Sequence, residues 1–210
     1  MNKKKSVFDG FIRENAVLSG LMVVSPIIVC GDTVMNALAM IYVFSAITFV
    51  SVLAGSFVPK KLTYGVKTII LAAIGAVVYI PVKFAAYDFF PSVMERTGIY
   101  FMLIAVNSLI TVHAQVKFYR MPKGKMTVSL ISHILGFDVV MLILSVIREL
   151  LSHGTFCGRI VDADVIISGL SMPFGGFILL GLCCGIYRSI VGAVRKNDDS
   201  AGGDSDVSDF

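Results

Sequence analysis

Charged residues are scarce in this sequence: Asp, Glu, Lys and Arg make up only 15% of its 210 residues. A soluble domain carries about 25% charged residues, and a chain of this length has too small a core to bury so much apolar surface. The mean hydropathy of +0.85 agrees with this shortage, which excludes a soluble protein and indicates an integral membrane protein. The basic residues lie between apolar runs, so the net charge of +4 does not indicate nucleic-acid binding.

Cysteine and histidine are also few, and their spacing excludes the common metal and disulfide frameworks. No pair of cysteines has C-x-x-C spacing, and Cys183 and Cys184 are adjacent within an apolar run. The histidines are 20 residues apart, which predicts that they lie near alternate faces of the membrane and not around one metal: His113, His133 and His153. The sequence has no Ser/His/Asp set and no glycine-rich phosphate loop. We therefore predict no catalytic residue and no metal site, and any redox substrate must bind to a partner.

Apolar runs dominate the chain and predict an all-α polytopic membrane protein with six transmembrane helices. Helices are favoured because lipid cannot satisfy exposed backbone groups, and the alternating segments of a β-barrel are missing. Residues 1–15 are then a cytoplasmic N-terminal lead, 16–192 the membrane domain, and 193–210 an acidic tail that we expect to be disordered. The six runs cover residues 16–30, 34–57, 66–90, 98–115, 127–151 and 164–192.

Lys and Arg are distributed unevenly between the loops, and this distribution sets the orientation in the membrane. With the N-terminus inside, fourteen of the 18 basic residues are cytoplasmic. The other four lie outside or near the outer surface: Lys83, Arg96, Arg148 and Arg159. Both termini are therefore predicted to be cytoplasmic, in the inner membrane of a bacterium or archaeon.

The first and fourth runs are too short to cross a membrane as regular helices. Their apolar parts, 16–29 and 99–112, have 14 residues each and would rise about 21 Å, against a hydrocarbon core of about 30 Å. Two short spans in corresponding positions predict inverted three-helix repeats, about 16–90 and 98–192, with half-helices in spans one and four. A pair of such breaks is a suitable place for a bound ion or cofactor.

Pro26 marks the break in the first run. It removes a backbone donor and clashes with the preceding turn, so the helix should kink or stop near Ser25. Gly31, Asp32 and Thr33 then provide a turn and an N-cap for the next helix.

Asp138 lies near the middle of the fifth apolar run. A carboxylate at that depth costs several kcal/mol unless it is paired, protonated or in contact with water. Two interpretations stay open: a protonated, hydrogen-bonded structural Asp at a helix interface, and a cation or proton relay. Together with Asn36 and Asn107 it forms a candidate ion or solute path. Arg148 and Glu149, which close the same run at its outer end, are interpreted as a structural pair.

Several stretches of the sequence resemble one membrane family. They are S-P at 25–26 with V-M-N-A-L at 34–38, G-I-Y-F at 98–101 with V-N-S at 106–108, R-E-L-L-x-x-G-T-F at 148–156, and P-F-G-G-F at 173–177. Over about residues 11–190 the chain resembles the RnfE/NqrD subunits of the Rnf and Nqr ion-pumping oxidoreductases, and more loosely their sister RnfA/NqrE subunits. The resemblance implies six spans, an inverted repeat, and electron transfer between flavins of partner subunits through a 2Fe–2S cluster shared with a sister subunit. In that family the electron transfer is coupled to Na⁺ or H⁺ movement.

The chain departs from the family at the cluster. The family has a Cys before the Pro of span one and another after the Asn of span four, and these positions are Ser25 and Ser108 here. Thiolates normally hold iron–sulfur clusters, and a hydroxyl must lose a much less acidic proton to replace one. Cys30 is five residues beyond Ser25 and has no counterpart near Ser108. The resemblance implies a non-catalytic or electron-relaying subunit of an Rnf/Nqr-like complex. The two serines imply that this subunit does not itself ligate a conventional 2Fe–2S cluster.

Two other functions stay open. A small-solute or ion transporter on the same inverted-repeat scaffold would line its site with polar residues: Ser25, Asn36, Asn107, Ser108 and Asp138. A transporter should bind its solute without redox partners, whereas an electron-transfer subunit should copurify with flavoproteins. A non-redox assembly subunit would keep its activity when Ser25 and Ser108 are replaced by Ala.

Overall fold

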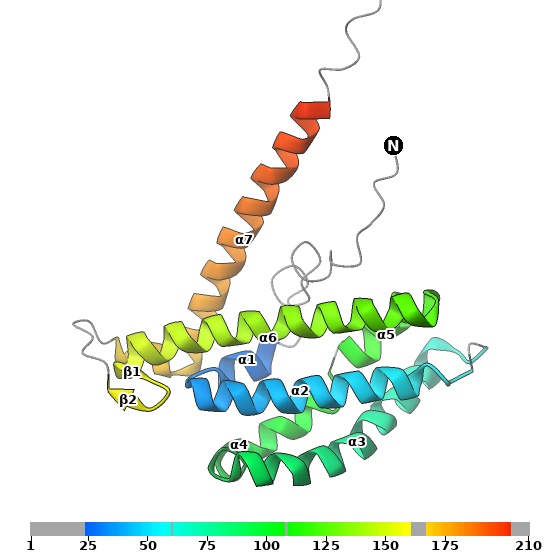
Figure 1. Ribbon diagram of the computed structural model, residues 1–210, viewed down its shortest axis with the longest axis horizontal. Coiled ribbons are helices and arrows are strands. Elements are labelled where there is room, and N and C mark those ends of the chain that lie inside the picture. Colours follow the sequence, from blue (N-terminus) through cyan, green and yellow to red (C-terminus); the bar gives the residue numbers. More distant parts are fainter. Residues whose placement is uncertain (1–23, 60, 108, 161–166, 203–210) are drawn as a thin grey trace, which may run out of the picture.

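The computed structural model describes residues 24–59, 61–107, 109–160 and 167–202, and helices form almost all of this part of the chain (Figure 1). In chain order the elements are α1 (Val24–Cys30), α2 (Val34–Gly55), α3 (Tyr64–Phe89), α4 (Pro91–Ile104), the π-helix η2 (Leu109–His113), α5 (Ala114–Val116), the 3₁₀-helix η3 (Phe118–Arg120), α6 (Lys123–His153), the hairpin strands β1 (Thr155–Phe156) and β2 (Arg159–Ile160), the 3₁₀-helix η4 (Ser168–Ser171) and α7 (Pro173–Gly202).

Five segments of the described chain are long and apolar enough to cross a membrane: Val34–Gly55, Tyr64–Phe89, Gly98–Arg120, Lys123–His153 and Pro173–Gly192. They match the predicted spans two to six and confirm an all-helical polytopic membrane protein. The predicted first span begins at residue 16, and of it only α1 is described. Six spans and the inverted repeat therefore stay predictions.

The two predicted terminal segments are described only in part. The lead at 1–15 lies outside the described residues, as do residues 203–210. Helix α7 runs to Gly202, so its helical backbone continues through the first part of the segment assigned to a tail.

Helix α2 lies at the centre of the bundle and packs antiparallel to α6 (Figure 1). The first residue of α2, Val34, contacts Glu149 near the end of α6. Further along, the rings of Phe44 and Phe137 stack with their centroids 3.8 Å apart. Both rings are almost fully buried. Burial of these large apolar side chains fixes the register in which α2 and α6 pack.

Helices α3 and α4 pack on the opposite side of α2 from α6 (Figure 1). Tyr42 of α2 packs against Phe89 and Phe90, at the point where α3 ends and α4 begins. Gly75 of α3 crosses α4 where that helix ends: a Cβ at position 75 would lie 2.0 Å from the carbonyl oxygen of Ala105. Only glycine permits this close approach of one backbone to another.

The turn between α1 and α2 has the predicted form. Thr33 is in an extended conformation, and its hydroxyl accepts a hydrogen bond from the backbone N–H of Asn36 at 3.3 Å. Thr33 therefore caps α2. The described part of α1 runs from Val24 to Cys30. The residues before Val24 lie outside the described chain, so the kink or stop near Ser25 stays a prediction. Pro26 is buried within this described part of the helix.

Helix α7 leaves the bundle at an angle (Figure 1). Its first turns pack against η4 and α1. A Cβ at Gly176 would lie 3.2 Å from the guanidinium carbon of Arg148 and from a methyl group of Ile28. The P-F-G-G-F sequence therefore supplies the small residue that allows α7 to approach α1 and the end of α6.

Candidate functional site

Asp138 is the central residue of α6, fifteen positions from either end of the helix. Its carboxylate is half-buried, and the hydroxyl of Ser45 on α2 lies 3.1 Å from each of its two oxygens. Ser45 is in turn at the middle of α2. A serine hydroxyl donates one hydrogen bond, so Asp138 has one side-chain donor on the facing helix. Since both helices are of membrane-crossing length, this contact lies midway between their ends.

Asn107 lies in the interruption of the fourth span, between the end of α4 at Ile104 and the start of η2 at Leu109. Its side chain is only 5% exposed. The amide nitrogen Nδ2 lies 3.0 Å from the carbonyl oxygen of Ile104 and 3.2 Å from the hydroxyl of Thr48 on α2. The amide oxygen Oδ1 accepts a hydrogen bond from the backbone N–H of Ile110 at 3.0 Å.

This arrangement adds side-chain hydrogen bonds at the helix interruption, where the carbonyl of Ile104 and the N–H of Ile110 also bond to the backbone of Asn107. A helix end exposes N–H and C=O groups, and inside a membrane they are tolerated only when the protein satisfies them. Asn107 caps the end of one half-helix and the start of the next, and it attaches both to α2 through Thr48. The described part of span four therefore contains an interruption, which side-chain hydrogen bonds of Asn107 and Thr111 stabilise.

Ser45 and Thr48 are three residues apart on α2, about 4.5 Å along the helix axis. Asp138 and Asn107 are thus bonded to neighbouring turns of α2. We call Ser45, Thr48, Asn107 and Asp138 the midspan polar set. Sequence reasoning selected the Asp and the Asn but missed the two hydroxyl residues. Their only sequence signal is a Ser and a Thr at i and i+3 in the middle of an apolar run.

The other predicted site residues lie elsewhere. The amide Nδ2 of Asn36 donates to Asp32 at 2.8 Å, near the start of α2 and nine residues before Ser45, which is about 13.5 Å along the axis. Ser25 is exposed near the start of α1. Ser108 lies outside the described residues. The structure therefore bonds Asn107 and Asp138 to neighbouring positions of α2, each through its own hydroxyl partner, and places Asn36 farther along that helix.

A second polar centre occupies the end of α6. The Arg148 side chain is 2% exposed and donates hydrogen bonds to three backbone carbonyls. The acceptor on α1 is Ile28, with an Nη1–O distance of 2.6 Å. The other two acceptors, Leu170 and Ser171, belong to η4, and each lies 3.1 Å from a guanidinium nitrogen. Arg148 thus connects the C-terminal part of α1 to the segment that leads into α7.

Glu149 has the complementary role, because a carboxylate only accepts hydrogen bonds. Its side chain is 1% exposed. It accepts from the N–H of Val34 at 2.6 Å, from the hydroxyl of Thr155 at 3.1 Å and from the N–H of Gly158 at 3.0 Å. Arg148 and Glu149, here called the end clamp, hold α1, the start of α2, the β-hairpin and η4 on the end of α6. The interpretation of this pair as structural agrees with these contacts.

The prediction that the histidines are far apart is wrong for two of them. The ring centroids of His113 and His133 lie 5.0 Å apart, and both rings contact Phe118. The chain folds back between η2 and α6, so His113 on η2 and His133 on α6 lie next to each other. Within the described residues, however, no three His, Cys, Asp or Glu side chains are placed to hold a metal ion.

The residues near the predicted cluster position do not fit a 2Fe–2S cluster. Cluster ligands are normally thiolates, and the nearest cysteine in sequence is Cys30. Its side chain is completely buried at the opposite end of α1 from Ser25. The described chain thus offers no thiol beside Ser25 on α1.

Replacing Asn107 by Ala should lower the free energy of unfolding by about 2–3 kcal/mol, because it removes three buried side-chain hydrogen bonds, to Ile104, Thr48 and Ile110. Thermal or denaturant unfolding of the purified full-length chain measures the change. Asn36→Ala is the matched control, since its side chain is half-buried and makes one hydrogen bond to Asp32; we expect a loss of about 1 kcal/mol. Equal losses for the two variants would contradict the capping role of Asn107.

Comparison with known proteins gives a consistent result. A family model described as "Rnf-Nqr subunit, membrane protein" matches residues 3–184. The chain is 29% identical over 163 residues to the E subunit of the ion-translocating oxidoreductase complex of Shewanella amazonensis, a match covering 73% of this chain and 66%, just under two thirds, of that relative. It is 25% identical to the protein of the same name from Thioalkalivibrio sulfidiphilus, over 90% of this chain and 89% of the relative. It is 27% identical to the protein of the same name from Shewanella piezotolerans, over 89% of this chain and 87% of that relative.

Proposed function

The chain belongs to the Rnf-Nqr family of membrane subunits, and we propose that it is the E-type subunit of an ion-translocating oxidoreductase complex. The observation that carries this proposal is the family match over residues 3–184, which includes every described membrane-length helix except the end of α7. Relatives that share the match are named as the E subunit of such a complex. In this role the chain works with a sister subunit and with flavoprotein subunits, and transmembrane electron flow drives Na⁺ or H⁺ translocation.

The electron route in this complex does not depend on a conventional 2Fe–2S cluster ligated by this chain. Ser25 and Ser108 occupy the positions where the family resemblance implies cysteines, and hydroxyls are poor substitutes for thiolate ligands. Cys30, which is buried at the far end of α1, does not replace them. The electron carriers therefore belong to partner subunits, and this chain supplies the membrane scaffold and part of the ion path.

The midspan polar set is the part of the chain best suited to that ion path. It offers a carboxylate, two hydroxyls and an amide at the middle of the bundle, and ionisable or polar residues at this depth mark ion and proton pathways. Oxygen atoms are also the ligands that hard cations select. We assign Asp138 as the charged residue of the path, with Ser45 as its hydrogen-bonding partner on α2.

Orientation follows from the distribution of Lys and Arg. Fourteen of the 18 basic residues lie on one side of the predicted spans, which favours both termini in the cytoplasm of a bacterium or archaeon. The end clamp then lies at the outer surface, and the loops joining α2 to α3 and η3 to α6 lie at the cytoplasmic surface.

Anaerobic purification through the full-length chain, followed by native mass spectrometry and assays of iron, acid-labile sulfide and flavin, tests the proposal. We expect flavoprotein subunits to copurify, and we expect the iron content to be unchanged, within about 10%, by Ser25→Ala with Ser108→Ala. Neither Ser25 nor Ser108 belongs to the midspan polar set. A 2Fe–2S signature that disappears in this double variant would contradict the proposed electron route.

A small-solute or ion transporter is the second candidate, and the midspan polar set favours it. Buried polar residues at a helix interruption, midway along the spans, are also the features of a transporter site. The same purification separates the two candidates. A transporter would be isolated without flavoprotein partners, and Asn107→Ala would weaken binding of its solute directly.

A further inference from the structure

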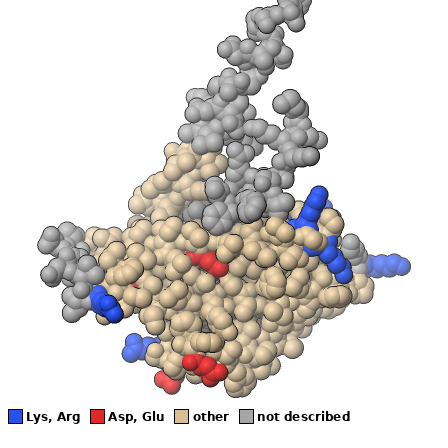
Figure 2. All heavy atoms as spheres, in the orientation of Figure 1, with Lys and Arg blue, Asp and Glu red and all other residues tan. Residues whose placement is uncertain are grey.

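Among the described residues, the ends of α2 and α6 opposite to the end clamp and the start of α3 carry basic residues and no acidic ones. The sequence has no Asp or Glu between Asp32 and Asp88, or between Glu95 and Asp138. These two stretches include the ends of α2 and α6 that lie opposite to the end clamp, and the start of α3. Figure 2 shows Lys and Arg side chains at the ends of the visible face and little charge across its middle. The described basic residues of this end are Lys61, Lys67, Lys117, Arg120, Lys123 and Lys125.

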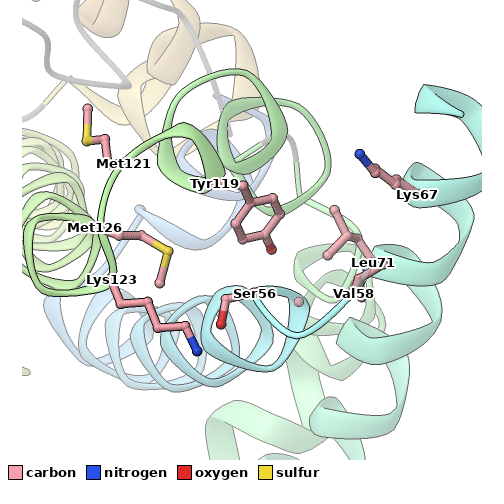
Figure 3. Close-up of a pocket in the computed structure, with 9 residues that line it drawn as sticks. Ser56, Val58, Lys67, Leu71, Tyr119, Met121, Lys123 and Met126 are labelled. Atoms are coloured by element: carbon pink, nitrogen blue, oxygen red, sulfur yellow. The ribbon is translucent and has the colours of Figure 1, made fainter. Parts of the chain in front are cut away.

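A cavity of about 80 Å³ opens within this basic end. Lys67 of α3 and Lys123 of α6 line it, and Figure 3 shows their side chains on either side of the Tyr119 ring. A cavity that holds one water needs about 10–15 Å³, so this one has room for a group of several heavy atoms, such as a phosphate. The remaining lining is largely apolar: Gly55, Ser56, Val58, Leu71, Met121 and Met126.

The protein itself holds the shape of this cavity. The hydroxyl of Tyr119 donates to the carbonyl of Val52 at 3.3 Å, which attaches the η3 segment to α2. Gly55 forms part of the cavity wall. A Cβ at this position would lie 2.2 Å from the Tyr119 hydroxyl oxygen, so glycine leaves room for the tyrosine. The ammonium group of Lys123 lies 4.7 Å from the ring centroid of Phe57, a cation–π contact that keeps the charge at the mouth.

We propose that this cavity binds the phosphate headgroup of an anionic phospholipid. Two ammonium groups provide charge for the phosphate, and the apolar lining suits the start of the acyl chains. The cavity lies at the ends of helices of membrane-crossing length, where lipid headgroups are found. Basic pockets between transmembrane helices at the cytoplasmic surface are typical sites for anionic headgroups. A free phosphate ion would not use the apolar half of the lining.

The test compares lipid retention in two double variants of the full-length chain. Lys67→Gln with Lys123→Gln removes the two cavity charges, whereas Lys61→Gln with Lys125→Gln removes two exposed charges of the same end. Each chain is titrated with phosphatidylglycerol or phosphatidylcholine and examined by native mass spectrometry. We expect the cavity variant to bind phosphatidylglycerol about 10-fold more weakly than the unmodified chain, and the surface variant to change less than about 2-fold.

The remaining outcomes decide between the proposal and its alternatives. Equal losses in both double variants would show a diffuse charge effect and overturn the site, as would equal binding of the two lipids. Displacement of phosphatidylglycerol by millimolar inorganic phosphate would assign the site to a free anion and overturn the lipid assignment. The single variant Lys123→Gln changes an exposed side chain, so it keeps the test valid if the double variant unfolds; it should lose about 3-fold in lipid binding.

Discussion

Replacing Arg148 by Ala is expected to lower the free energy of unfolding by about 3–5 kcal/mol. The guanidinium is 2% exposed and donates to carbonyls on α1 and η4. Alanine leaves these buried acceptors without donors and creates a void where α7 approaches at Gly176. Unfolding of the purified chain in detergent, followed by circular dichroism against denaturant, measures the loss.

Two further variants separate the geometry of Arg148 from its charge. Arg159→Ala removes the same charge from an exposed position nearby and should change the free energy of unfolding by less than about 0.5 kcal/mol. Arg148→Lys keeps the charge but loses the planar fork that reaches several carbonyls, so we expect an intermediate loss of about 1–3 kcal/mol. If Arg148→Ala unfolds like the unmodified chain, the end clamp does not hold α1 and η4 in place.

The sequence allowed the membrane helices to be predicted closely because their signal is local. A run of apolar residues of the right length is sufficient, and the prediction of 66–90 differs from α3 (Tyr64–Phe89) by two residues at one end and one at the other. The cap at Thr33 could also be predicted, since the donor and acceptor are three residues apart. The break in span four required only the shortness of the run, and Asn107 provides its chemistry.

Contacts between distant residues could not be predicted in the same way. The bond between Ser45 and Asp138 depends on how α2 and α6 are rotated and aligned, and apolar runs do not encode rotation. The approach of His113 to His133 was missed because spacing along the chain does not show that η2 and α6 fold back on each other. Arg148 and Glu149 stood out as a motif, but most of their partners are backbone groups, which leave no trace in the sequence.

The midspan polar set distinguishes this chain from a bundle held together by apolar packing alone. Asn107 has backbone partners on both sides of the helix interruption, so its contacts are sufficiently explained by capping. Asp138 differs, because its side-chain partner is a single hydroxyl and the group remains half-buried. A group placed only for stability at this depth would be expected to have more partners. This difference makes Asp138 the residue of the set at which function and stability can be separated.

Asp138→Asn should reduce ion translocation by the assembled complex more than about 10-fold while the complex still forms. Asparagine has nearly the same shape, and its amide oxygen can still accept a hydrogen bond from Ser45, but it cannot carry a negative charge or a transferable proton. Ion uptake and electron-transfer rate are measured together in proteoliposomes. Asp88→Asn, which removes a charge from an exposed position near the end of α3, is the control and should leave both rates unchanged.

Normal uptake in Asp138→Asn, together with a changed free energy of unfolding, would instead assign Asp138 to the α2–α6 interface as a structural residue. Reduced uptake with unchanged unfolding would place the ion path between these two helices.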